Sequence, residues 1–145
     1  MANIFDMMPR FSYSRDLHAH LKGLDITCSS YSAGTTIYGY VVMIMLIVSP
    51  IIMANFYYGI FNRPKFANFW VWLLNVLIAS AITFCCAFIQ SSSDLKHSRY
   101  CSQLHFNTVD CLLFGFTAAT YTVIACLLIS FIIKWKSLNN KKIPG

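Results

Sequence analysis

Residues 40–48 read Tyr-Val-Val-Met-Ile-Met-Leu-Ile-Val, and they form the centre of an apolar run from about 36 to 61. At about 1.5 Å of rise per residue, an α-helix over this run would be about 39 Å long. That length crosses the roughly 30 Å of hydrocarbon in a bilayer with some tilt. Pro50 lies inside the run and predicts a kink. The stretch therefore predicts a first transmembrane helix.

Two more apolar runs follow, at about 69–89 and 109–133. Trp70 and Trp72 open the second run, where aromatic side chains commonly mark the membrane interface. The polar turn at 62–65 is so short that the first two spans must form an antiparallel hairpin.

Composition supports the same fold class. The 145 residues are 57% hydrophobic and only 11% charged, against about 25% charged in an average soluble domain. So few charges cannot cover the surface of a water-soluble globule. We expect one all-α membrane domain over residues 1–145, with three transmembrane helices and one short amphipathic helix.

The segment 1–35 is polar and carries the amphipathic helix. Tyr13, Leu17, Leu21 and Leu24 recur at helical spacing, which predicts a helix over about 12–24, on the membrane surface or against a partner. A loosely ordered tail is the alternative, because Gly23 weakens a helix. No signal-peptide core is visible in this segment, so the first span itself is expected to direct insertion.

Basic residues predict the topology. Three spans place the tail 1–35 and the loop 91–108 on one side, and the turn 62–65 and the basic tail 134–145 on the other. Six of the 11 Lys and Arg residues lie in those last two short segments, and the cytoplasmic side is enriched in such residues. We expect the N-terminus outside and the C-terminus in the cytoplasm. The net charge of +6 follows span ends, not a basic stripe, so no nucleic acid is expected.

Cysteines and histidines gather on the predicted outer side. Oxidising compartments favour disulfides, and Cys28 could pair with Cys101 or with Cys111, at the membrane border. In a reducing setting all three would be free thiols. Connectivity does not follow from sequence.

The outer histidines have side chains that bind metals, but their spacing is poor for one site. They are His18, His20, His97 and His105. On a helix, His18 and His20 point about 200° apart, and no compact ligand motif supports a metal site. We expect solvated surface histidines and no metal or other cofactor.

Small residues form a stripe on the third span, which favours close approach of another helix. The stripe consists of Gly115, Ala118, Ala119, Thr122, Cys126 and Ser130. Packing within this chain's own bundle and docking of another protein, or of a second copy, both remain possible. Asn55 and Asn75 lie within the spans and are expected to bond between helices.

One segment resembles a known family. The stretch that begins Asp110-Cys-Leu-Leu-Phe-Gly-Phe and ends at Lys134-Trp-Lys136 is similar to the last helix of MARVEL-domain proteins. This resemblance implies a role in organising membranes. Those proteins have four spans and both termini inside, and this chain offers three. In size, helix count and lysine-rich ends the chain also resembles small immunity proteins against pore-forming bacteriocins.

These features predict a non-catalytic membrane subunit or interaction protein. No ionisable side chain lies deep in a span, whereas transporters usually need one there, and no catalytic constellation is visible. The docking surfaces would be the third helix and an outer cap made of 1–35 and 91–108, for another membrane protein or a second copy. An immunity protein, an outer metal or thiol-redox module, and a MARVEL-like membrane organiser are the alternatives.

Overall fold

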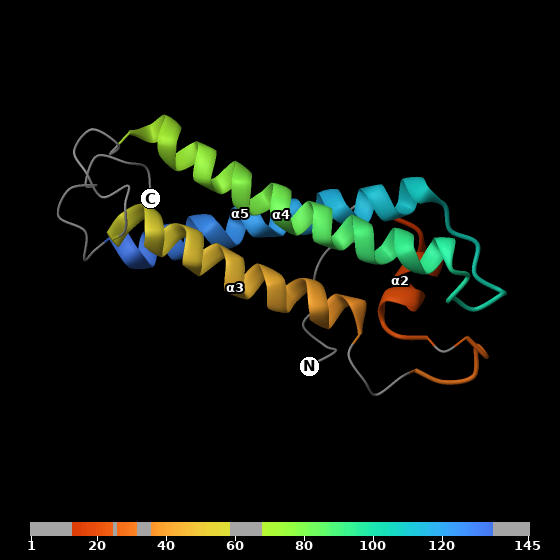
Figure 1. Cartoon of the computed structure of the whole chain (residues 1–145). Helices are drawn as coiled ribbons and strands as arrows, with labels where there is room; N and C mark the ends of the chain where they lie inside the picture. Colours follow the sequence, from red (N-terminus) through yellow and green to blue (C-terminus); the bar gives the residue numbers. More distant parts are fainter. Residues whose placement is uncertain (1–12, 25, 32–35, 59–67, 135–145) are drawn as a thin grey trace. The chain divides into compact units, whose positions relative to one another are not determined.

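The computed structural model describes residues 13–24, 26–31, 36–58 and 68–134 (Figure 1). Within them the chain is all-helical, as predicted, and an isolated bridge between Leu24 and Tyr31 is the sole β-type pairing. The helices are α2 (Arg15–Leu21), α3 (Ile37–Tyr58), α4 (Phe69–Lys96) and α5 (Thr108–Lys134). The predicted turn 62–65 and the basic tail beyond Lys134 lie outside the described residues.

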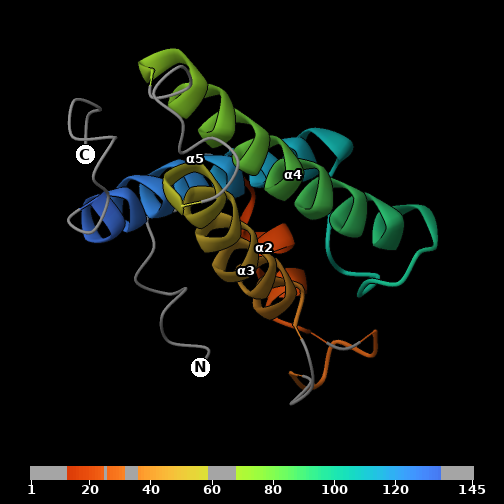
Figure 2. The same ribbon diagram turned by 60° about the vertical axis from the view of Figure 1, so that its left-hand side comes forward.

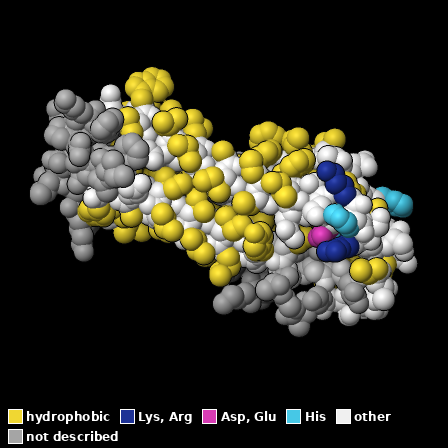
Figure 3. Space-filling view, in the orientation of Figure 1, with side chains coloured by type: hydrophobic (Ala, Val, Ile, Leu, Met, Phe, Trp, Pro, Cys, Tyr) yellow, Lys and Arg dark blue, Asp and Glu magenta, His cyan; other side chains and the backbone are white. Residues whose placement is uncertain are grey.

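Each long helix is long and apolar enough to cross a membrane, which confirms the three predicted spans. Many of their large apolar side chains point away from the protein interior, including Leu46, Ile78 and Leu128. Hydrophobic side chains cover the long helices in Figure 3, and the Lys, Arg and His side chains on that face gather where α4 ends. An apolar surface of this extent needs lipid around it.

Helix α4 extends further than predicted. The expected span ended near Ile89, but the helix continues through Lys96 and contains 28 residues, about 42 Å at a rise of about 1.5 Å each. The hydroxyls of Ser91 and Ser92 donate to carbonyls of their own helix, so the polar residues after Ile89 do not interrupt it. The first part of the predicted loop 91–108 is therefore helical.

Helix α2 is shorter than the predicted 12–24. Ser14 caps its start, because the Ser14 hydroxyl accepts the backbone N–H of Leu17 at 3.3 Å. Gly23 ends it with φ 89°, a left-handed conformation that glycine adopts without strain. The N–H groups of Gly23 and Leu24 then bond back into the last turn of the helix. Gly23 thus terminates the helix cleanly.

The chain forms two compact units. Among the described residues, the first unit joins those of 13–43 with Phe84–Ala118, and the second joins those of 44–83 with those of 119–134. Figures 1 and 2 both show α2 beside the first turns of α3, within the first unit. The contact is made by the rings of His18 and Tyr38, with centroids 5.6 Å apart.

The second unit has an apolar core with one polar contact at its centre. Its buried residues are Met53, Phe56, Tyr57, Trp72, Val76, Ala79 and Cys126. The Ser130 hydroxyl, fully buried, bonds with the Tyr57 hydroxyl and accepts the Trp72 indole N–H at 3.1 Å. Three helices thus meet at one serine.

Candidate functional site

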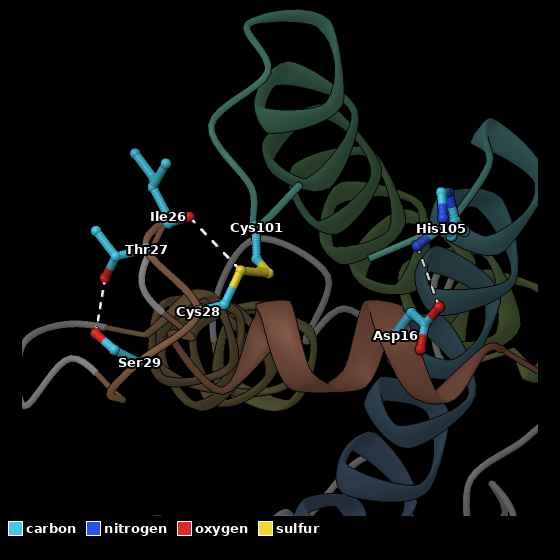
Figure 4. The surroundings of a disulfide bond; sticks show 7 residues. All are labelled: Asp16, Ile26, Thr27, Cys28, Ser29, Cys101 and His105. Carbon is cyan, nitrogen blue, oxygen red and sulfur yellow. Dashed lines mark hydrogen bonds between the residues drawn. A yellow bond between two sulfur atoms is a disulfide. The ribbon is translucent and has the colours of Figure 1, made fainter. Parts of the chain in front are cut away.

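The first unit contains a region outside the three long helices, which we call the cap. It consists of residues 13–31, without residue 25, and residues 97–107. Cys28 and Cys101 join its two segments by a disulfide, with Cα atoms 5.4 Å apart (Figure 4). This is one of the two pairings that the sequence left open. The other candidate, Cys111, is a buried free cysteine. The disulfide fixes the loop after α2 to the loop after α4.

Two carboxylates bind the cap to itself and to α5. Asp16 on α2 accepts the backbone N–H of His105 at 3.1 Å, as Figure 4 shows. Asp110 accepts the N–H of Asn107 at 3.0 Å and that of Ser14 at 3.2 Å. The contact with Asn107 satisfies a free backbone N–H at the N-terminus of α5. The contact with Ser14 links the N-terminus of α5 to the N-cap residue of α2.

Two of the four histidines contradict the expectation of solvated side chains. His18 and His20 are 7% and 6% exposed, because α2 packs both faces against the rest of the first unit. His97 and His105 are exposed, as expected, and His97 Nδ1 lies 2.9 Å from the Ser93 carbonyl oxygen. Among the described residues, no three His, Cys, Asp or Glu side chains gather where they could hold a metal.

His20 lies between α2, the end of α4 and the loop that follows it. Its ring stacks on Phe106 with centroids 5.5 Å apart and meets the edge of Tyr100 at 6.4 Å. Its Nε2 lies 3.3 Å from Asp94 Oδ2, but this contact lacks hydrogen-bond geometry. Neither ring nitrogen has a hydrogen-bond partner among the described residues. Burial lowers the pKa of His20 from its ordinary value of 6.5, and this outweighs the opposing effect of Asp94.

The loop after α2 presents apolar side chains outward. Ile26 is 59% exposed and Tyr31 is 60% exposed. The disulfide holds the middle of this loop, and the bridge between Leu24 and Tyr31 closes its ends. Inside it, the Thr27 and Ser29 hydroxyls bond to each other at 2.8 Å. The loop is therefore a fixed surface that carries two exposed apolar side chains.

The small-residue stripe on α5 faces the protein's own interior. Thr122, Cys126 and Ser130 are fully buried within the second unit. In the first unit Ala118 is buried and Gly115 packs against Phe84, whose ring carbons lie 3.0 Å from where a Cβ would be. Ala119 is half-buried. Five of the six predicted residues are thus buried, and Ala119 is the exception.

The two span asparagines do not form the expected bonds between helices. The Asn75 amide donates to the Val71 carbonyl of its own helix at 2.7 Å, and Asn55 is exposed.

Sequence reasoning missed the roles of Asp110 and Asn107, although the signal was present. An Asn followed three residues later by a carboxylate, just before an apolar run, resembles the pattern of a capped helix start. The burial of His20 had no comparable signal, because it depends on segments that lie more than 70 residues apart in sequence.

Comparison with known proteins finds no matching family model, no matching curated protein and no matching solved structure.

Proposed function

We propose that this chain is a non-catalytic membrane protein that docks the extramembrane part of another membrane protein through its cap. The observation that carries the proposal is the exposed pair Ile26 and Tyr31 on a loop that the disulfide holds in place. Aromatic and aliphatic anchors on a pre-ordered surface bind well, because little conformational entropy is lost on association.

The buried stripe on α5 supports the choice of the cap over the third helix. Side chains already packed inside the chain's own helices cannot contact a partner unless these helices separate. The lipid-facing surfaces of the spans are then left for the bilayer, and the cap is left for protein contact.

The topology we propose has the cap outside and the C-terminus in the cytoplasm. A disulfide between Cys28 and Cys101 supports this orientation, since such bonds persist in oxidising compartments. The lysines of the basic tail support it independently.

Native membranes solubilised in mild detergent provide the test. The wild-type chain should migrate in a complex larger than its own monomer. An Ile26→Asp, Tyr31→Ser variant should migrate as the monomer, while Gln103→Asp, an exposed cap substitution outside this loop, should keep the complex. Equal migration of all three chains, or a complex that contains only copies of this chain, would contradict the proposal.

A further inference from the structure

His20 is the one buried side chain of the cap that lacks the hydrogen bonds its chemistry requires. Buried polar groups in proteins are nearly always hydrogen-bonded, and neither nitrogen of His20 has such a partner among the described residues. A neutral imidazole tolerates this apolar position between Phe106 and Tyr100 far better than an imidazolium does.

The position of His20 matters because its side chain lies where α2 meets two other segments of the first unit. It reaches from α2 to Asp94 in the last turns of α4 and to the loop 97–107. Its neighbours on α2, Leu17 and Leu21, are fully buried in the same core. A charge on His20 would therefore act on the packing of the whole helix.

We propose that His20 is a pH-sensitive latch, which holds α2 against α4 and the 97–107 loop when neutral and releases α2 when protonated. The disulfide between Cys28 and Cys101 keeps the released helix tethered, so the opening is local and reversible. The proposal concerns the chain alone and does not depend on what the cap binds.

The groups that face His20 set the direction of the effect. Asp94 on α4 favours the charged imidazole, and Tyr100 on the following loop contributes a ring edge. On α2 itself, the carboxylate of Asp16 is bonded to the His105 N–H, and the His18 ring packs against Tyr13 and Tyr38. Only Asp94 offers His20 a nearby negative charge among these groups.

The direction in which pH changes the stability of the closed cap follows from the pKa of His20. Burial lowers the pKa of His20 in the closed cap below its ordinary 6.5, the value expected once the ring reaches water. The closed cap keeps its full stability above pH 6.5 and loses it as the pH falls toward the pKa of the closed state. Within this window the ratio of open to closed cap rises by up to about tenfold per pH unit.

Hydrogen exchange of the α2 amides in detergent-solubilised full-length protein tests the latch, with rates corrected for the intrinsic pH dependence of exchange. We expect corrected rates in α2 to rise as the pH falls below 6.5, by up to about fivefold between pH 6.5 and 5.5, and those in the core of α5 to stay constant. A His20→Phe variant should abolish the rise, whereas Asp94→Asn should enlarge it. His97→Phe, at an exposed histidine, and His18→Phe should both leave the rise in place.

A measurement on the unmodified chain covers the case in which His20→Phe fails to fold. NMR titration of ring-labelled histidines should place the pKa of His20 below 6.5. A pKa above 6.5, or α2 exchange that slows in acid, would overturn the latch, because it would mean that the charged His20–Asp94 pair holds the cap closed.

Discussion

Each of the two units is stabilised internally by a different kind of interaction. The first unit, at residues 13–43 and 84–118, joins its segments with a disulfide, with backbone N–H groups bonded to Asp16 and Asp110, and with packed aromatic rings. The second unit, at residues 44–83 and 119–134, relies on close apolar packing around Ser130. Water competes for polar contacts and lipid does not. The cap therefore needs covalent and charge-assisted bonds. Within the spans, the hydroxyl of one serine is enough to supply the polar contact at the centre of the apolar core.

Removal of the disulfide should produce the largest effect. A Cys28→Ser, Cys101→Ser variant should lose about 2–4 kcal/mol of stability in the cap, because the link constrains segments 73 residues apart. Hydrogen exchange should locate the loss in the first unit. The matched control is Cys85→Ser, at an exposed free cysteine. Equal protection of the cap in both variants would contradict a stabilising role for the disulfide.

Overpacking at Gly115 should cause the second-largest loss of stability. A Cβ at this position would lie 3.0 Å from two ring carbons of Phe84, so Gly115→Leu should cost about 1–3 kcal/mol of unfolding free energy. Thermal unfolding in detergent measures the change. Ala81→Leu, at an exposed position on α4, should leave the midpoint nearly unchanged, and a similar loss there would remove the argument for close helix approach.

Loss of the Ser130 hydroxyl should be milder. Ser130→Ala removes the bond with the Tyr57 hydroxyl and leaves the Trp72 indole N–H without its acceptor, at a cost of about 1 kcal/mol. The same unfolding assay should show a loss for Ser130→Ala and almost none for Ser92→Ala, whose hydroxyl bonds only its own helix. No difference between the two would mean that Ser130 does not hold the second unit.

The smallest expected effect is an increase in the stability of the first unit. Ser98, two residues after the end of α4, has φ 51°, a left-handed conformation that strains a residue with a Cβ. Ser98→Gly should therefore raise the stability of the first unit by about 0.5–1 kcal/mol, because the relieved strain exceeds the entropic cost of glycine. Ser102→Gly, in the same loop, supplies the comparison, since no left-handed conformation is relieved there. A loss at position 98 would show that the conformation carries no strain.

The spans and the disulfide candidates were predictable because each depends on one local property. Hydropathy over about 20 residues identifies a membrane helix, and the basic residues at span ends predict which cysteines share a side. The continuation of α4 through Lys96 was not predictable, because Ser-rich sequence reads as loop until its hydroxyls are seen bonded to the helix. The burial of His18 depended on Tyr38 of α3 and that of His20 on Tyr100 and Phe106 of the loop 97–107, which no local pattern encodes.

Outside-only labelling of thiols on intact cells, read by peptide mass spectrometry, measures both the disulfide and the side of the membrane on which the cap lies. We expect Cys28 and Cys101 to react with a membrane-impermeant reagent only after an impermeant reductant has been added, and from outside the cell. Labelling of both without reduction, or only after the membrane has been opened, would contradict a disulfide-closed outer cap.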